Sequence, residues 1–491
     1  MKKNNSKLKI LIGAFVVVNL FTISCSEEFL EIEANQITAN SITEEQAVEL
    51  VNGIYNIFLS WQVSSFSWNG ITSIASDDAD KGSDPGDTGS DKHLLDALNH
   101  DATSISVAEL WEGHFNGIQR ANQAINRIQP FDDLDNELKT RLLGEAKFLR
   151  ALLYFRLLQT FGELPLITET PDINSPLEEL LSRATIDETF LFIEGDLIQA
   201  IESLPNKNQY PNIELGRATK GAAKTLLAKL SMYQEKWDNV LALTNEVIES
   251  GEYSLTSNYE DIWKEIGENN EESIFEIQAK GAIPSVGVDK YSLTQGARGE
   301  GGWGWGFNIP STDLLNSYEE NDLRRDATII FRGETLYDGR YVPESVVNEM
   351  YNQKAYSSAF TEFEQTGKNI RILRYAEVLL MNAEAAIHLG GDVSGPINQL
   401  RSRAGLNPLN SPTQLDVWNE RRWELAFEHD RYFDLVRQGR AAAVLQSLGK
   451  PFVTGKHELF PIPQQQIDPV SYTHLRAHET EADLVCRLLL E

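Results

Sequence analysis

Apolar residues recur every three or four positions along residues 141–158, and this spacing constrains the fold more than any other feature of the chain. Leu142, Ala146 and Leu149 fall on one face of a helix with about 3.6 residues per turn. Further apolar residues widen that face, so the helix is predicted to be buried on two sides. Gly162 predicts its end, because glycine favours helix termination.

Similar spacing recurs along most of the chain. The further predicted helices span residues 185–204, 219–234, 237–250, 370–389 and 414–438. Thr185 and Glu188 form a capping-box pattern at the start of the first of these helices. Alanine-rich faces and short connections predict a mainly α fold, built from irregular tetratricopeptide-type repeats that form an α-α superhelix.

Two long insertions interrupt the predicted repeats, which cover about 105–255 and 370–445. The insertions cover about 61–104 and 256–369, and they concentrate glycine, tryptophan, tyrosine and asparagine. Because loops on a rigid scaffold commonly carry binding residues, we expect the ligand on the side of the insertions.

The N-terminus has the pattern of a secretory signal. Four lysines precede an apolar run from Ile10 to Phe21, and Cys25 follows shortly after. This pattern predicts that residues 1–24 are a signal peptide. An uncleaved membrane anchor is the alternative, but the run is shorter than the about 20 apolar residues that a spanning helix needs.

The residues around Cys25 resemble a bacterial lipobox, which implies that this cysteine is acylated and begins the mature chain. Ser26-Glu27-Glu28 resembles a short acidic signal that sends lipoproteins to the cell surface. Residues 25–40 would then be a lipidated tether. Because several acyl chains anchor a protein stably, we expect it on the exterior of the cell outer membrane.

The composition excludes some partners. The formal net charge is −30, which argues against nucleic acid and against anionic lipid surfaces as partners. A hydrophobic content of 41% with only 17 prolines is typical of a globular chain and not of a disordered stalk.

Several motifs, taken in order, resemble one known family. They are 145–155 (EAKFLRALLYF), 161–165 (FGELP), 304–307 (GWGF), 322–326 (DLRRD), 374–385 (RYAEVLLMNAEA), 401–406 (RSRAGL), 420–428 (ERRWELAFE), 431–437 (RYFDLVR) and 460–463 (FPIP). Together they resemble the SusD/RagB family of outer-membrane nutrient-binding lipoproteins.

This resemblance implies a single SusD-like domain over residues 41–468, with helical repeats packed on a loop-rich region. It also implies a partner, a TonB-dependent outer-membrane transporter of the SusC type. Members of the family bind glycans or peptides and have no catalytic residues. An oligosaccharide is therefore the expected ligand of this chain.

Residues 470–491 do not resemble the family. They resemble translated adaptor or vector sequence, and we exclude them from the predicted fold. This tail supplies Cys486, His474 and His478, so a metal site built on them would be spurious. Cys25 and Cys486 are the only cysteines, and an intramolecular disulfide framework is not expected.

Aromatic residues in the insertions are the candidate ligand-binding residues. Trp61 and Trp68 precede an acidic stretch that contains Asp78, and Trp303 and Tyr337 lie in the second insertion. Ring faces can stack on the apolar faces of sugars, while a carboxylate such as Asp78 can bind hydroxyl groups. The alternative is that these rings pack the loops onto the helices. That alternative is favoured for Trp305, which lies within a family motif.

The charged segments and the glycine-rich motif are predicted to have structural roles. Six aspartates between Asp77 and Asp91 could bind calcium, but no EF-hand pattern is present, so a solvated acidic loop is expected and no cofactor is predicted. Residues 299–304 match G-x-G-x-x-G without the flanking strand and helix that a dinucleotide site needs. The charges within 420–437 are predicted to form a structural ion network, because apolar rings share the same helix.

Four hypotheses follow. The leading one is a surface lipoprotein that binds an oligosaccharide and does no chemistry on it. A peptide-binding member of the same family, a glycoside hydrolase with two carboxylates across a cleft, and a scaffold that binds protein on its concave surface are the alternatives.

Overall fold

The helices predicted from apolar spacing are present and pack side by side in the computed structural model, which describes residues 42–170, 182–281, 287–358 and 365–468. The predicted signal peptide, tether and foreign tail lie outside these residues. None of the helices in the described ranges has both the length and the apolar character of a membrane span.

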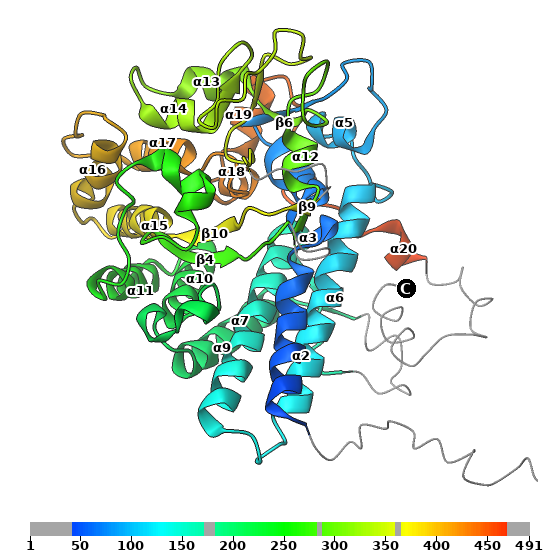
Figure 1. Ribbon diagram of the computed structural model, residues 1–491, viewed down its shortest axis with the longest axis vertical. Helices are drawn as coiled ribbons and strands as arrows, with labels where there is room; N and C mark the ends of the chain where they lie inside the picture. The colour runs from blue at the N-terminus through cyan, green and yellow to red at the C-terminus, as the bar shows by residue number, and fades with distance from the viewer. Residues whose placement is uncertain (1–41, 171–181, 282–286, 359–364, 469–491) are drawn as a thin grey trace, which may run out of the picture. The chain divides into compact units, whose positions relative to one another are not determined.

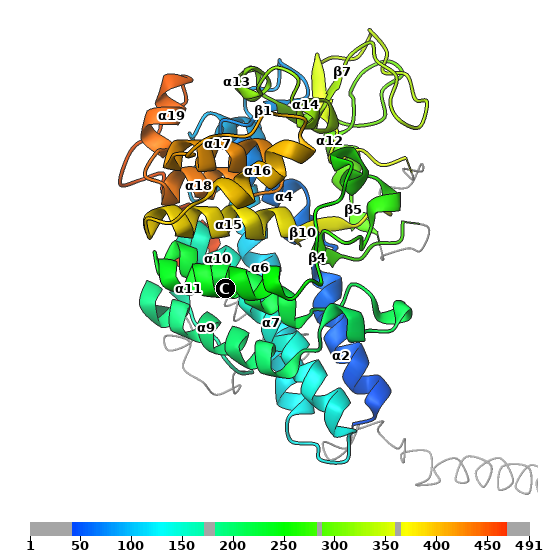
Figure 2. The same cartoon turned by 90° about the vertical axis from the view of Figure 1, so that its left-hand side faces the viewer.

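Helices from both halves of the chain make up much of the described structure. They are α2 (Glu44–Ile57), α6 (Ile105–Ile128), α7 (Asn136–Phe161), α9 (Ile186–Ser203), α10 (Lys220–Tyr233), α11 (Trp237–Glu249), α15 (Tyr375–His388), α16 (Ser394–Arg403), α17 (Gln414–Leu425), α18 (Arg431–Arg437), α19 (Ala441–Ser447) and α20 (Gln464–Ile467). Figure 2 shows α9, α11, α15 and α17 as successive layers. The predicted mainly helical fold is confirmed.

The predicted two-sided burial of α7 is also confirmed. This helix packs against both α6 and α9. Its buried polar residues have partners on neighbouring elements: Glu145 pairs with Arg217 at 2.9 Å, and Arg150 pairs with Asp196 at 2.8 Å. At the start of α9, Thr185 forms the predicted capping box, which satisfies backbone N–H groups at the helix end.

The two insertions form the loop-rich part of the described structure. The first contains α3 (Trp61–Ser64), α4 (Phe66–Asn69), the π-helix η2 (Gly70–Ile74), β1 (Ala79–Gly82) and α5 (Asp91–Asp96). The second contains η5 (Tyr259–Trp263), η6 (Glu265–Gly267), β4 (Ser273–Ile277), β5 (Val288–Asp289), α12 (Tyr291–Gln295), β6 (Phe307–Pro310), α13 (Thr312–Ser317), α14 (Leu323–Thr328), β7 (Ile329–Phe331), β8 (Met350–Asn352) and β9 (Gln365–Thr366). The remaining short elements are β2 (Leu164–Pro165), β3 (Arg183–Ala184), η3 (Lys207–Gln209), η4 (Asn212–Glu214) and β10 (Ile370–Arg374).

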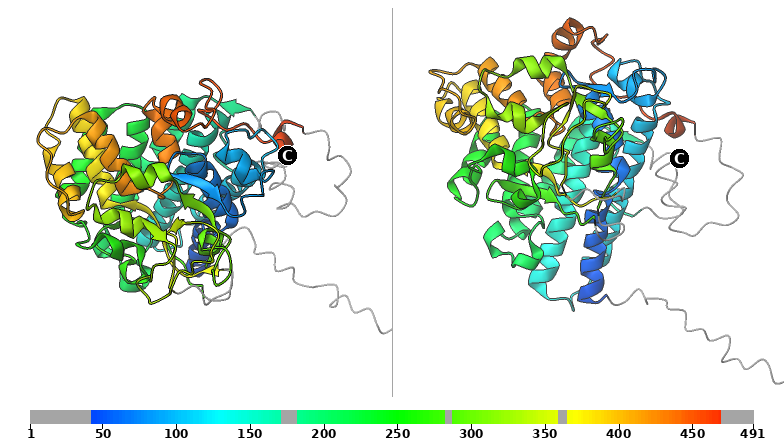
Figure 3. Two further views of the ribbon diagram at one scale, coloured as in Figure 1. Left: turned by 90° about the horizontal axis from the view of Figure 1, so that it is seen from above. Right: turned by 45° about the horizontal axis from the view of Figure 1, so that its top comes forward.

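All the strands pair antiparallel in two-stranded sheets: β1 with β6, β2 with β3, β4 with β10, β5 with β9, and β7 with β8. The β1–β6 pair joins the first insertion to the second, although their residues are more than 200 positions apart in the sequence (Figures 1 and 3).

The predicted helix 370–389 is corrected at its start. Residues Ile370–Arg374 form β10, and α15 begins only at Tyr375. Antiparallel pairing with β4 takes these residues out of the helix. The strand conformation lets Arg371 reach Glu276 at 3.5 Å, a contact between distant segments that helical spacing does not reveal.

The predicted helix 414–438 is two helices, α17 and α18. The chain between them turns because Phe427 and His429 have positive φ values of 64° and 75°. Such values are uncommon for residues other than glycine and interrupt a right-handed helix. The break frees the Glu424 carbonyl, which accepts from Arg374 Nη2 at 2.8 Å and from the Tyr259 hydroxyl at 2.7 Å.

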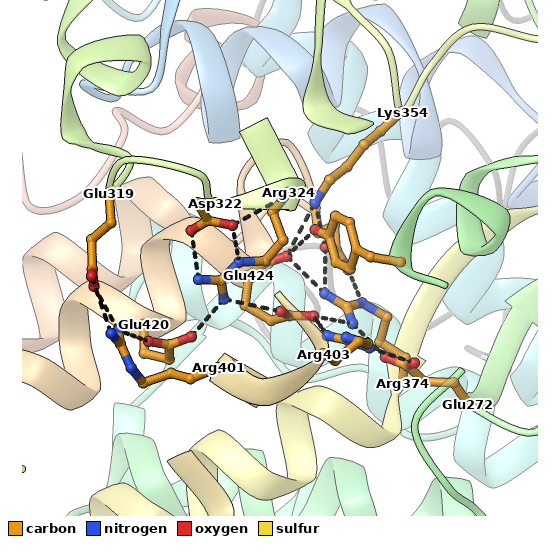
Figure 4. A network of polar contacts seen from close by, with 12 residues as sticks. Glu272, Glu319, Asp322, Arg324, Lys354, Arg374, Arg401, Arg403, Glu420 and Glu424 are labelled. Carbon is orange, nitrogen blue, oxygen red and sulfur yellow. Dashed lines mark hydrogen bonds and ion pairs between the residues drawn. The ribbon is translucent and has the colours of Figure 1, made fainter. Parts of the chain in front are cut away.

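A buried ion network joins the loop-rich part to the helices (Figure 4). Arg324 on α14 pairs with Glu420 on α17 at 2.6 Å. Arg374 at the end of β10 pairs with Glu272 and with Glu424, each at 2.6 Å. The ion network comprises Glu272, Glu319, Asp322, Arg324, Lys354, Arg374, Arg401, Arg403, Glu420, Glu424 and Glu428.

The prediction of structural ion pairs within 420–437 is therefore confirmed. Besides the ion network, Arg421 pairs with Asp434 at 2.6 Å, and Arg437 pairs with Glu384 at 2.7 Å. Burial disfavours ionisation of Glu424, but its arginine neighbours outweigh that effect and hold the pKa of this carboxyl well below its usual range.

We expect Arg374→Met to lower the free energy of unfolding by about 3 to 5 kcal/mol, because it leaves buried carboxylates without their cation. Urea denaturation measures this change. Arg325→Met is the matched control, since the Arg325–Asp326 pair is exposed to solvent, and a change below about 0.5 kcal/mol is expected there. Equal effects of the two substitutions would contradict this role of Arg374.

Lys368 is held by backbone carbonyls. Its ammonium donates to the carbonyls of Trp263 at 2.9 Å, of Lys354 at 2.8 Å and of Tyr356. Burial lowers the pKa of Lys368 to about 7. In the unfolded chain the lysine pKa is about 10.4, so the unfolded state binds more protons between these two values.

The free energy of unfolding is therefore expected to rise with pH from about 7 towards 10, as the charged lysine no longer has to be buried. In Lys368→Met this contribution disappears, and the slope between pH 7 and 9 falls by up to about 1.4 kcal/mol per pH unit. Urea denaturation at pH 7, 8 and 9 measures the slope. Identical slopes for the two proteins would show that Lys368 keeps its proton when buried.

Candidate functional site

Four aromatic rings from the two insertions meet at one place. The Trp61 ring lies 4.9 Å from Phe66 and 6.2 Å from Trp305, measured between ring centroids. Phe66 lies 4.8 Å from Phe307. All four rings are half-buried, so each keeps some surface towards solvent. We call Trp61, Phe66, Trp305 and Phe307 the aromatic cluster.

A single carboxylate on α6 fixes the first half of the aromatic cluster. Glu109 accepts a hydrogen bond from Trp61 Nε1 at 2.9 Å, and the same oxygen accepts from the Ser67 hydroxyl. The Lys92 ammonium lies 3.9 Å from the centroid of the Phe66 ring, in a cation–π contact. Glu109 thus orients the Trp61 ring from the helical side, and Lys92 on α5 orients the Phe66 ring from within the first insertion.

Strand pairing fixes the second half. Phe307 on β6 is paired with Gly82 on β1. Gly82 has a φ of 67°, and a Cβ atom there would lie 2.3 Å from the Gly306 carbonyl oxygen, so only glycine permits this approach. The Trp305 backbone N–H donates to the Leu293 carbonyl at 2.8 Å. The β1–β6 pairing and this hydrogen bond thus hold the backbone on both sides of the aromatic cluster.

Among the predicted ligand-binding residues, the structure places Trp61 in the aromatic cluster but corrects the expectation for Trp68. The Trp68 side chain is only 3% exposed. Its ring packs 5.9 Å from Phe433 and 6.2 Å from His429, and the Arg156 guanidinium lies 4.7 Å from it. Trp68 therefore fills the core between the first insertion and the C-terminal helices.

Asp78 is corrected for a similar reason. It is 1% exposed, and Arg422 Nε donates to it at 2.7 Å. Burial raises the pKa of Asp78. For the neighbouring Asp77, burial acts in the same direction, but Arg431 and Arg422 outweigh it and lower the pKa. This part of the acidic run joins the insertion to the helices and is not the solvated loop that was expected.

Trp303 and Tyr337 belong to a second group of rings. Trp303 is 8% exposed and packs 5.4 Å from Tyr356, with the Arg340 guanidinium 5.2 Å from its ring. Tyr337 is half-buried and lies 5.6 Å from Tyr356. For Trp303 the structure corrects the expectation of an exposed ring, because the ring fills the core of the second insertion.

Trp305 is the residue that sequence reasoning assigned to the core and that the structure places in the aromatic cluster. The signal was present, because glycines flank it on both sides and leave its ring uncovered by neighbours in the sequence. Within the described residues, no three histidine, cysteine, aspartate or glutamate side chains gather closely enough to hold a metal ion.

Comparison with known proteins identifies the family. Residues 271–471 match the family described as "SusD family", and residues 29–232 match the family described as "Starch-binding associating with outer membrane". Together the two matches cover the described residues except 233–270, which contain α11, η5 and η6. The chain belongs to the SusD family. SusD-family proteins are non-catalytic binding proteins associated with the outer membrane, so this chain is a binding protein and not an enzyme.

Relatives match over nearly their whole length. SusD-like protein P25 of Formosa agariphila is 27% identical, and the match covers 94% of this chain and 97% of that protein. A solved "Laminarin binding SusD-like protein" is 27% identical with a TM-score of 0.75, covering 87% of this chain and 98% of that one. Surface glycan-binding protein A from Bacteroides thetaiotaomicron, solved with laminarihexaose, is 26% identical with a TM-score of 0.75, covering 88% and 98%.

We expect Glu109→Ala to release the Trp61 ring of this SusD-family protein, because the indole N–H and the Ser67 hydroxyl lose their shared acceptor. The near-UV circular dichroism of the tryptophans should lose intensity, and the free energy of unfolding should fall by about 1 to 3 kcal/mol. Glu109→Gln keeps an acceptor oxygen and should retain most of the signal. A Glu109→Ala spectrum identical to that of the unaltered protein would show that other contacts orient Trp61.

Proposed function

We propose that this chain binds an oligosaccharide at the aromatic cluster and passes it to a transporter in the outer membrane. The single observation that carries the proposal is the aromatic cluster itself. Its rings are half-exposed, and they are held by Glu109, by Lys92 and by the β1–β6 pairing. Rings held in place lose little conformational freedom when a ligand stacks on them, and this saving favours binding.

The chemistry of the aromatic cluster suits a sugar. Aromatic faces carry partial negative charge and pack well against C–H groups, which one face of a pyranose ring presents. The names of two solved relatives support the same ligand class, since one is called laminarin binding and the other was solved with laminarihexaose.

The proposal includes an anchor and a partner. Acylation of Cys25 would tether the domain to the outer face of the outer membrane, and residues 25–40 would be the tether. Cys25 and these residues lie outside the described part of the chain. A TonB-dependent transporter of the SusC type is the proposed recipient of the ligand, and the match to a family described as associating with the outer membrane supports this partner.

Trp61→Ala and Trp305→Ala are each expected to weaken glycan binding at least about tenfold, or about 1.4 kcal/mol, because each removes a stacking face. Trp237→Ala is the matched control. Trp237 is also half-buried, but it stacks on His388 on the helical side. Binding is measured by isothermal titration calorimetry on the chain from residue 27 to 468, with ligands chosen from a glycan and peptide screen.

Several outcomes would contradict the proposal. Unchanged affinity in both aromatic-cluster variants would remove these rings from the site. Binding of peptides, with no glycan bound, would favour the peptide-binding alternative. If the protein hydrolyses a bound glycan, and substitution of a single carboxylate abolishes this hydrolysis, the protein does not act by binding alone.

A further inference from the structure

A groove lies along the second half of α2 and has a volume of about 270 Å³. Its walls come from three separate parts of the chain. They include Asn52 and Tyr55 from α2, Leu59 from the turn that follows it, Phe275 and Ile277 from β4, and Ile213 and Gly216 from the connection between α9 and α10. Asn52 and Asn56 are one turn apart on the same face of α2, so the helical part of this wall is about 6 Å long.

The groove and the aromatic cluster are formed by neighbouring residues of the chain. Leu59 lines the groove, and Trp61 follows two residues later, where α3 begins at the end of α2 (Figure 1). The Leu59 carbonyl accepts a hydrogen bond from the Asp289 backbone N–H at 2.9 Å. The next residue, Lys290, places its ammonium 5.3 Å from the centroid of the Trp61 ring. One short stretch of backbone therefore borders both sites.

The charges in the groove are already paired. Arg217 pairs with Glu145 at 2.9 Å, and it also donates to the Asn52 side chain at 3.2 Å. Glu214 pairs with Arg141 at 2.7 Å. With these charges paired, the groove favours a ligand without formal charge. Rings, aliphatic side chains and amides make up the rest of its lining, a combination that suits apolar faces edged with hydroxyl groups.

The rim of the groove has a feature that packing within the chain does not explain. Ile213 is 93% exposed, the highest value among the exposed large apolar side chains of the described residues. Beside it, Gly216 has a φ of 97°, and a Cβ atom there would lie 2.2 Å from the side chain of Gln278. The local backbone thus brings the connection close against Gln278 and leaves the isoleucine at the edge of the groove.

We propose that this groove is a second subsite, which binds the part of a neutral oligosaccharide chain that continues past the aromatic cluster. The inference rests on the proposed function, because the aromatic cluster binds the other part of the same chain. It predicts a site that favours long ligands over short ones. A short oligosaccharide fills the aromatic cluster alone, whereas a longer one also covers apolar groove surface and gains affinity from that burial.

The test compares ligand length in matched variants. Laminarihexaose and maltohexaose are titrated against each protein by calorimetry, together with the trisaccharide of each series. Ile213→Glu places a charge at the rim, and Asn52→Trp fills the groove from α2; both side chains are exposed, so the fold tolerates the changes. Ile266→Glu is the control, since Ile266 is 85% exposed on η6 and does not line the groove.

Both groove variants are expected to weaken hexasaccharide binding about tenfold and to leave trisaccharide binding unchanged. Ile266→Glu should change neither, and Trp61→Ala should weaken both. Unchanged hexasaccharide affinity in the groove variants would overturn the second subsite, while the loss in Trp61→Ala would leave the proposed function intact. Weakening by the groove variants without any effect of Trp61→Ala would overturn the aromatic cluster as a site. Failure of all four sugars to bind would overturn a neutral glucan as ligand.

Discussion

The buried ion network is the interaction on which the rest of the structure depends. Arg324 and Arg374 carry positive charge into an interior that water does not reach, and carboxylates of α17 neutralise them. A buried charge without a partner is costly, so the second insertion can pack against the helices only in the arrangement that satisfies these pairs. Asp77, paired with Arg431, plays the same part for the first insertion. Ion pairs thereby specify where the first and second insertions pack against the helices.

That arrangement makes the aromatic cluster possible. Neither insertion contains it alone, because Trp61 comes from the first and Trp305 from the second. The helices contribute the groups that fix the rings, with Glu109 on α6 as the clearest case. The proposed binding site is thereby held in place by contacts from three parts of the chain, although its residues lie in short turns and loops. Rings that are already held in place lose little conformational entropy when a sugar binds.

Membership of the SusD family, the aromatic cluster and the groove all support the proposal that the chain binds a glycan. The family consists of binding proteins of the outer membrane, and the chain shares its fold with solved glycan-binding relatives. Within that fold, the ring faces and the groove, whose charges are paired, suit a chain of neutral sugars. The strong negative charge of the chain as a whole is carried elsewhere, since the charges lining the groove are paired.

The sequence by itself determined most of the helices and the resemblance to the family. The spacing of Leu142, Ala146 and Leu149 predicts α7, and the capping box at Thr185 predicts the start of α9, because both are local properties of consecutive residues. Only the tertiary structure decided which rings face solvent. Trp61 and Trp68 lie in the same glycine- and serine-rich stretch, yet residues from the far end of the chain cover the second and leave the first half-exposed. Burial depends on contacts between distant segments, and local sequence patterns do not encode those contacts.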